Sequence, residues 1–258
     1  MAQRCIPARR AAGRSGDPYH GPGAAKPWIV RRAGRELRGP LATIIFDFDS
    51  TLVGCESLEE IARHQLKGDE NRARQYQELT NAGMAGTMTF NESLRARLEI
   101  ARPHRSALVR FGQQAPHPWT AGVPDLVGQL MSAGHEVWIV SGAPIEVLIA
   151  AGAQLGIPPE RIRGVRLKWS ATGEFEGVDP DDPFSHSKVL GVSGLEQSWP
   201  SPRIMVGDGA TDRALYDHGL VNFFIPFTAH VRRPEVLGDG VPEANSVQRL
   251  EELIGSYL

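Results

Sequence analysis

The sequence predicts an α/β fold, a doubly wound and mostly parallel sheet with a small helical domain inserted after the first strand. From Trp119 onward, helical stretches alternate with short apolar runs, which is typical of parallel strands covered by helices on both faces. Before that part, a helical stretch of about sixty residues separates the first apolar run from the rest. The 258 residues suffice for one large core and a small second domain.

Residues 1–40 have the composition of a disordered segment. They contain six Gly and five Pro, and nine Lys or Arg against two Asp or Glu, with no hydrophobic period. Such a segment buries too little apolar surface to offset the entropy of ordering, so we predict a disordered, basic extension. Two alternatives stay open, an organelle transit peptide and a start site assigned too far upstream.

The first predicted strand covers residues 42–48, because β-branched and aromatic side chains in a short run indicate a buried strand. A predicted helical domain, residues 55–116, follows it. Apolar residues recur there at helical spacing, at Leu58, Ile61, Ala62 and Leu66 and again at Leu94, Leu98 and Ala101. We assign the flanking residues 41–54 and 117–258 to the core that contains the sheet.

The rest of the chain alternates between helices and strands. Proline near a helix start and glycine beyond its end mark the helices, and β-branched runs mark the strands. The predicted elements are a helix at 124–133, a strand at 136–140, a helix at 144–156, a hairpin at 166–179, a strand at 204–206, a helix at 211–218, a strand at 221–224 and a last helix from Val247.

Charge is unevenly distributed along the chain. Residues 1–40 carry nine positive and two negative residues, a balance of +7, whereas residues 41–258 carry nineteen and twenty-eight, a balance of −9. Affinity for a phosphate backbone comes from clustered Lys and Arg, so the acidic part argues against a nucleic-acid-binding surface. An anionic substrate would then need a local device such as a metal ion.

The two cysteines, Cys5 and Cys55, cannot form a disulfide framework and lack the spacing of a zinc site, which favours a reducing compartment. No stretch approaches the roughly 20 apolar residues needed to cross a bilayer, and no apolar run of a secretory signal follows the basic N-terminus. We therefore expect a soluble, cytoplasmic protein without a membrane partner.

Reactive side chains follow three of the predicted strands. In an open parallel sheet, ligands bind outside the carboxyl ends of the strands. The residues at these ends are Asp47, Asp49, Ser50 and Thr51 after the first strand, Ser141 and Gly142 after the second, and Gly207, Asp208, Gly209 and Asp212 after a later one. Gathered carboxylates without His or Cys are hard oxygen ligands, which select Mg²⁺ over zinc and suit a phosphate substrate.

Asp47 and Asp49 are two residues apart on a strand, so their side chains are expected on the same face. One carboxylate could attack phosphorus while the other handles the proton of the leaving group. The pair therefore predicts a nucleophile and a general acid.

Three segments resemble motifs of haloacid-dehalogenase-superfamily phosphatases. Residues 46–53 (FDFDSTLV) resemble the first motif, residues 140–142 (VSG) the second and residues 206–212 (VGDGATD) the fourth. The Asp-Ser-Thr form of the first motif is similar to the phosphoserine phosphatase branch, subfamily IB. Four residues of the helical domain add to this similarity: Glu56, Met84, Phe90 and Arg97. The resemblance spans about residues 42–255 and implies a Rossmann-like core with a helical cap.

The resemblance also implies a role for each matching residue. Asp47 would be the nucleophile that forms an aspartyl-phosphate, and Asp49 the general acid and then the base. Mg²⁺ would be held by Asp47, Asp208 and the backbone carbonyl of Asp49, with Asp212 orienting the metal site. The phosphoryl oxygens would contact Ser141, Gly142 and a lysine. The substrate would meet Glu56 at its ammonium group, Arg97 at its carboxylate, and Met84, Phe90 and Thr211 around it.

Two positions depart from the family pattern. The second motif usually continues with another glycine, but here Ala143 and Pro144 follow. The lysine of the third motif can be matched by Lys188, or its position by His186. We predict Lys188, because a long and permanent cation best neutralises an acyl-phosphate.

The resemblance implies a Mg²⁺-dependent phosphomonoesterase that releases L-serine from O-phospho-L-serine, a step of serine biosynthesis. A phosphatase or phosphotransferase for another small phosphomonoester is the alternative. A non-catalytic Mg²⁺-binding module that is phosphorylated on Asp47 is disfavoured, because it needs neither a lid nor the general acid Asp49. The substrate partner is expected to be a small phosphorylated amino acid, and the sequence leaves open whether the chain is a monomer or a homodimer.

Overall fold

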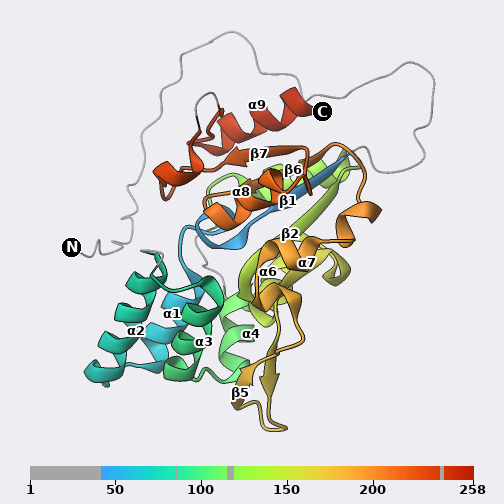
Figure 1. Cartoon of the computed structure of the whole chain (residues 1–258). Coiled ribbons are helices and arrows are strands. Elements are labelled where there is room, and N and C mark those ends of the chain that lie inside the picture. The colour runs from blue at the N-terminus through green and yellow to red at the C-terminus, as the bar shows by residue number, and fades with distance from the viewer. Residues whose placement is uncertain (1–41, 85–86, 115–118, 239–240) are drawn as a thin grey trace, which may run out of the picture. The chain divides into compact units, whose positions relative to one another are not determined.

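The computed structural model describes residues 42–84, 87–114, 119–238 and 241–258 (Figure 1). The predicted disordered extension, residues 1–40, lies outside the described residues, and so does the predicted end of the helical domain at residue 116. The side chain of Met84 lies outside them as well. The division into core and helical domain therefore stays a prediction.

A five-stranded parallel sheet forms the centre of the fold. Its order is β3-β2-β1-β6-β7, and all four strand pairs are parallel. The strands are β1 (Thr43–Phe46), β2 (Glu136–Pro144), β3 (Ile162–Val165), β6 (Arg203–Gly207) and β7 (Phe223–Pro226). The chain builds outward from β1 to β3 and then returns to the other side of β1, so the direction reverses between β1 and β6. The predicted doubly wound sheet is confirmed.

Helices cover both faces of this sheet, as expected for buried parallel strands. They are α5 (Val123–Ser132), α6 (Ile145–Gly152), α7 (Lys188–Val192), α8 (Ala210–Asp217) and α9 (Val247–Tyr257). On one face, Ile45 and Met205 of the strands pack with Val192 of α7 and Leu215 of α8. On the other face, Gly152 of α6 packs directly on Ile162, because an added Cβ would clash there.

Four helices lie between β1 and α5 in the sequence. They are α1 (Ser57–Gln65), α2 (Glu70–Met84), α3 (Phe90–Ala101) and α4 (Arg105–Gln113). The seven apolar residues that predicted these helix faces are buried. Among them, Ala62, Leu66 and Ala101 pack with Tyr76 of α2 in a small core of their own.

The two connections between the sheet and these helices run side by side. Val53 and Trp119 form an antiparallel bridge. Next to it, Thr120 donates through Oγ1 to the carbonyl of Thr51 at 2.7 Å and through its backbone N–H to the carbonyl of Leu52 at 2.9 Å. The helices therefore leave and rejoin the sheet at one place.

A small antiparallel hairpin, β4 (Leu167–Trp169) and β5 (Phe175–Val178), extends from the sheet alongside α3 and α4 (Figure 1). This confirms the predicted hairpin around Thr172 and Gly173. In the described part of the chain, no helix is both long and apolar enough to span a bilayer.

Candidate active site

Asp47 lies at the carboxyl end of β1, where a tight turn begins. The backbone N–H of Asp47 still bonds the carbonyl of Val206 in β6 at 2.9 Å. The next five residues, Phe48–Leu52, form an irregular helical turn in which Ser50 has a left-handed φ of 53°. The strand therefore ends at Phe46, two residues earlier than predicted, and Asp49 lies in the turn rather than on the strand with Asp47. Backbone strain of this kind is commonly held at functional sites.

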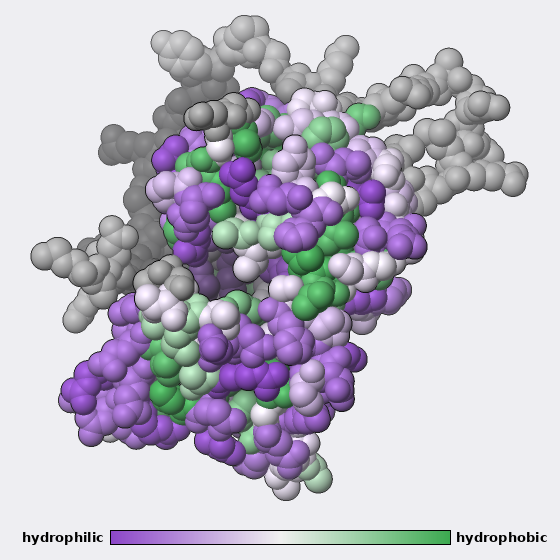
Figure 2. All heavy atoms as spheres, viewed as in Figure 1, coloured by the Kyte–Doolittle hydropathy of each residue, from purple (hydrophilic) through white to green (hydrophobic). Residues whose placement is uncertain are grey.

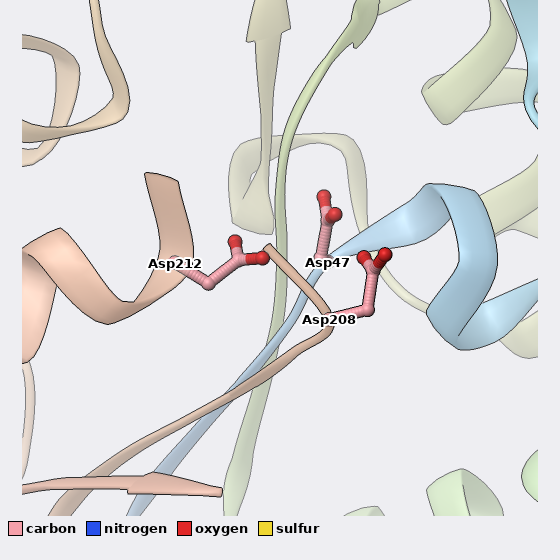
Figure 3. A group of neighbouring side chains, drawn as sticks. All are labelled: Asp47, Asp208 and Asp212. Atoms are coloured by element: carbon pink, nitrogen blue, oxygen red, sulfur yellow. The ribbon is translucent and has the colours of Figure 1, made fainter. Parts of the chain in front are cut away.

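Asp208 and Asp212 come from the neighbouring strand β6 and the helix α8 that follows it. The carboxylate of Asp212 accepts from the backbone N–H of Gly209 at 3.0 Å and packs so closely on Gly207 that a Cβ would not fit there. One carboxylate oxygen each from Asp47, Asp208 and Asp212 lie within 4.8 Å of one another (Figure 3). The three side chains thus meet at the point where the strand order reverses, the place where open α/β sheets bind ligands.

Lys188, the first residue of α7, lies against this acidic cluster. Its Nζ is 2.7 Å from Asp47 Oδ1 and 2.5 Å from Asp212 Oδ1, and only 6% of the side chain is exposed. Burial disfavours the charged ammonium, but the adjacent carboxylates of Asp212 and Asp47 raise the pKa of Lys188 above its usual value. His186, the alternative, is exposed and does not line the pocket, so the structure brings Lys188 to the cluster.

The surroundings of the carboxyl groups in this region disfavour their ionised form. Burial, followed by repulsion from Glu56 and Asp47, raises the pKa of Asp49 well above its usual value. Burial and then repulsion from Asp47 raise the pKa values of Asp208 and Asp212 as well. Carboxylates that repel one another out of water favour a bound cation.

The cluster opens into a pocket of about 330 Å³ between the sheet and the four helices. Figure 2 shows the molecule hollowed between these two parts, with both hydrophilic and hydrophobic residues at the rim. The pocket is lined by these predicted site residues: Asp47, Asp49, Glu56, Phe90, Arg97, Ser141, Gly142, Lys188, Asp208, Thr211 and Asp212. Apart from Met84, every predicted site residue therefore faces one cavity.

Asp49 and Glu56 are both anchored near the start of α1. Ser57 donates to Asp49 twice, through its backbone N–H to Oδ1 and through Oγ to Oδ2, each at 3.0 Å. Glu56 accepts from Ser50 Oγ at 2.8 Å, and burial raises its pKa. The general-acid candidate is thus held by the helical part of the chain rather than by the sheet.

Phe90 and Arg97 reach the pocket from α3. The ring of Phe90 packs on Gly142 so closely that a Cβ at Gly142 would lie 2.8 Å from Phe90 Cζ. Arg97 Nη1 is 3.0 Å from Glu59 Oε1, which also accepts from Thr80 Oγ1 at 2.9 Å. Glu59 and Thr80 therefore orient Arg97, and the sequence motifs did not point to either of them.

Arg233 is a second residue that the sequence did not identify. Its Nε donates to Asp208 Oδ2 at 2.9 Å, and its Nη2 lies 3.7 Å from Glu56 Oε1. Burial disfavours its charge, but the contact with Asp208 raises the pKa of Arg233. Arg233 follows β7 in an irregular segment without a motif, so only the fold reveals its position at the pocket.

The acidic cluster fits a hard divalent cation. All three nearby ligand groups are carboxylates, buried and within reach of a common point, which is the oxygen-rich environment that such ions prefer. Two of them, Asp47 and Asp208, belong to the predicted metal set. Asp212, predicted as an orienting residue, lies close enough to be a ligand itself.

The parallel sheet, the aspartates at its point of reversal and the helices over the pocket define the chain as a capped α/β enzyme. A family model described as haloacid dehalogenase-like hydrolase matches residues 44–216. The chain belongs to the haloacid dehalogenase-like hydrolase family. This confirms the superfamily to which the sequence motifs were similar.

Curated relatives support the predicted branch of this family. A phosphoserine phosphatase of Drosophila melanogaster is 33% identical over 198 residues, which cover 75% of this chain and 70% of the relative. A phosphoserine phosphatase of Rattus norvegicus is 31% identical over 207 residues, 78% of this chain and 88% of the relative. The similarity to the phosphoserine-phosphatase-like branch is thereby confirmed.

Solved structures agree with this placement. A phosphoserine phosphohydrolase-like protein from Francisella tularensis is 34% identical, with a TM-score of 0.76 over 83% of this chain and 100% of the other. A phospho-aspartyl intermediate analogue of a phosphoserine phosphatase is 22% identical, with a TM-score of 0.63 over 83% of this chain and 99% of the other. The second similarity shows the shared fold.

Proposed function

We propose that this chain hydrolyses O-phospho-L-serine to L-serine and phosphate through an aspartyl-phosphate on Asp47. The observation that carries the proposal is a single pocket with groups for each end of that molecule. Asp47 and Lys188 lie on its sheet side, and Glu56 and Arg97 lie on its helical side. Relatives named phosphoserine phosphatase, about 30% identical to this chain, support the same substrate.

At the phosphate end, a carboxylate oxygen of Asp47 would attack phosphorus while the bond to the seryl oxygen breaks. The ammonium of Lys188 would hold a phosphoryl oxygen, together with Ser141 and the backbone of Gly142. Lys188 is already fixed by ion pairs to Asp47 and Asp212, so it needs little reorganisation when charge develops. Phosphoryl transfer depends mainly on such positioning and charge neutralisation.

Asp49 would give its proton to the departing seryl oxygen and later take one from the water that attacks the aspartyl-phosphate. Its raised pKa supports the first of these roles, because a carboxyl group that stays protonated can act as an acid. Ser57 holds both of its oxygens, which would keep the group in one orientation.

The amino-acid end of the substrate would lie under the helices. Arg97 offers a planar pair of N–H donors that suits a carboxylate, and Glu56 offers a carboxylate to the ammonium group. Phe90 would pack against the substrate, and Thr211 would lie at its edge. Met84 stays a prediction here.

We propose Mg²⁺ as the cofactor, held by the carboxylates of Asp47 and Asp208 and by the backbone carbonyl of Asp49. Asp212 would orient the site or bind the ion directly. When bound, Mg²⁺ would neutralise phosphoryl charge and keep Asp47 ionised. The all-carboxylate composition of the cluster supports this assignment.

Phosphate release from a panel of phosphorylated amino acids, sugars and nucleotides tests the substrate. We expect O-phospho-L-serine to have the highest kcat/KM. A flat profile over the panel would reject phosphoserine as the substrate, and transfer of the phosphoryl group to an added alcohol would favour a phosphotransferase.

Asp47→Asn tests the mechanism. An amide cannot act as the nucleophile, so turnover should fall by about 1,000-fold or more, the scale expected when a covalent nucleophile is removed. The circular dichroism spectrum should not change, because asparagine has nearly the same shape. Full activity of this variant would reject the aspartyl-phosphate.

A further inference from the structure

Asn91, the second residue of α3, bonds the helical part to the turn before α7. Its Nδ2 donates to the carbonyl of Ser185 at 2.8 Å and lies 3.2 Å from Nδ1 of His186. Its Oδ1 accepts from Arg95 Nε at 2.6 Å. An amide nitrogen only donates, so His186 must accept through Nδ1. Both sides of the amide are thus engaged.

The turn that Asn91 contacts belongs to the phosphate end of the pocket. Ser185 is buried, and its Oγ donates to the carbonyl of Asp182 at 2.8 Å. Two residues later, Ser187 caps α7 by accepting from the backbone N–H of Leu190 at 3.1 Å. Lys188 follows at once and is fixed by its two ion pairs. Asn91 therefore contacts a segment that is fixed to the sheet.

The helix that Asn91 belongs to carries the groups for the other end of the substrate. Phe90 precedes Asn91, and Arg97 lies further along α3. Thr89 and Glu92 form a capping box that fixes the first turn of this helix. Arg97 and Asn91 therefore belong to one continuous helix, and the bonds of Asn91 hold the first turn of that helix against the segment that leads to Lys188.

Two further bonds join α3 and the residue that ends it to strand β5 of the hairpin. Arg95 Nη1 reaches the carbonyl of Val178 at 3.5 Å, and Arg102 Nη2 donates to the carbonyl of Phe175 at 2.9 Å. Together with Asn91 they align α3 along the hairpin. In this series, Asn91 makes the contact with the segment that ends in Lys188.

We propose that Asn91 is a positioning residue that sets the helix carrying Arg97 in register with the turn that presents Lys188. This inference rests on the proposed phosphoserine hydrolysis. A substrate with charges at both ends has to meet Lys188 and Arg97 at once, and a misplacement of about 1 Å can cost on the order of 100-fold in rate. Inorganic phosphate needs the Lys188 end alone.

The test compares Asn91→Ala with the control Asn81→Ala. Asn81 lies in α2, and its side chain accepts a hydrogen bond from Gln77 of the same helix. In the first variant, kcat/KM for O-phospho-L-serine should fall by about 10- to 100-fold. The inhibition constant of inorganic phosphate should stay within about twofold, because Lys188 keeps its own ion pairs. The control variant should match the wild type in both measurements.

Arg97→Ala as a background separates positioning from general damage. If Asn91 acts through Arg97, adding Asn91→Ala to Arg97→Ala should cost less than about twofold more. Asn91→Asp keeps the acceptor for Arg95 but lacks the two N–H donors, so it should reproduce the selective loss if the alanine variant does not fold.

Three results would overturn the inference: an unchanged kcat/KM in the Asn91 variants, an equal weakening of phosphate inhibition, or additive losses in the double variant. Failure of the proposed function is seen separately, in the wild type. If the unmodified protein does not hydrolyse O-phospho-L-serine, the inference falls with that function, before any variant is compared.

Discussion

Two cations from distant parts of the chain neutralise the aspartates of the pocket. Lys188 contacts Asp47 and Asp212 from the start of α7, and Arg233 contacts Asp208 from the segment after β7. Lys188 is buried whereas Arg233 is half-buried. A buried charge that loses its partner costs more than an exposed one, so the Lys188 pairs are the more sensitive to substitution.

Lys188→Ala and His186→Ala distinguish the two candidates for the third motif. Removing Lys188 takes away the cation nearest to Asp47, so kcat should fall by about 100-fold or more, the scale seen when one preorganised donor is lost. His186→Ala should reduce kcat less than about tenfold, because the ring is exposed and outside the pocket. Phosphate release measures the activity of both variants. If Lys188→Ala stays active and His186→Ala is inactive, His186 fills the third-motif position instead of Lys188.

The residue pattern alone could predict the site residues that follow strand ends, whereas Glu56, Phe90 and Arg97 could be predicted only from the family resemblance. Asp47 and Asp208 sit at the carboxyl ends of β1 and β6, and the rule for parallel sheets places such side chains together. Arg233 and Glu59 could not be found in this way. Each contacts its partner across a distance in sequence that no motif spans, and a charge on a helix or a loop is usually solvated.

At the level of elements, α3 both packs in the interior of the helical part and contributes residues to the pocket. Its buried face, with Leu94 and Leu98, holds it to the other helices, and its first residue Phe90 packs on Gly142 at the pocket. Its start is fixed by Thr89, whose Oγ1 accepts from the backbone N–H of Glu92 at 3.2 Å. The local sequence thus sets where this helix begins.

Thr89→Ala should lower the free energy of unfolding by about 1 kcal/mol, because an N-cap acceptor is lost from the start of α3. Thr89→Ser keeps the hydroxyl and is the matched control. Urea unfolding followed by circular dichroism measures both, and equal midpoints for the alanine variant and the wild type would contradict the role of the cap.

The elements that sequence patterns missed are short or displaced. β3 has four residues, and one of them is Gly164, so the local sequence does not predict a strand there. The last strand of the sheet begins at Phe223 rather than at residue 221, because strand ends depend on the register with β6 rather than on local preference. The turn after Asp47 needs tertiary contacts for its irregular backbone, so the predicted strand ran too far.

In the described part of the molecule, sheet topology and charge act together. Reversal of the strand order between β1 and β6 brings Asp47 and Asp208 close, and α8 adds Asp212. Part of the excess negative charge of residues 41–258, which argues against a nucleic-acid-binding surface, is thus concentrated at one pocket. A dication bound there would relieve the repulsion that raises the pKa values of Asp208 and Asp212.

Stabilisation by Mg²⁺ should therefore depend on pH. A raised carboxyl pKa means that the folded protein holds protons more readily than the unfolded chain, and these protons compete with the ion. The increase in Tm on adding Mg²⁺ to metal-free protein should be larger at pH 8 than at pH 5.5. At a free concentration of 100 times Kd, the ion contributes about 2.7 kcal/mol.

Differential scanning fluorimetry with EDTA or Mg²⁺ at each pH measures this effect. Because each comparison is made at one pH, histidines that do not contact the ion, such as the buried His135, cancel in the difference. Asp208→Asn removes one ligand charge and should abolish most of the Mg²⁺ shift while the protein stays folded. An increase in Tm that is equal at both pH values, or is retained in the Asp208 variant, would show that the ion binds elsewhere.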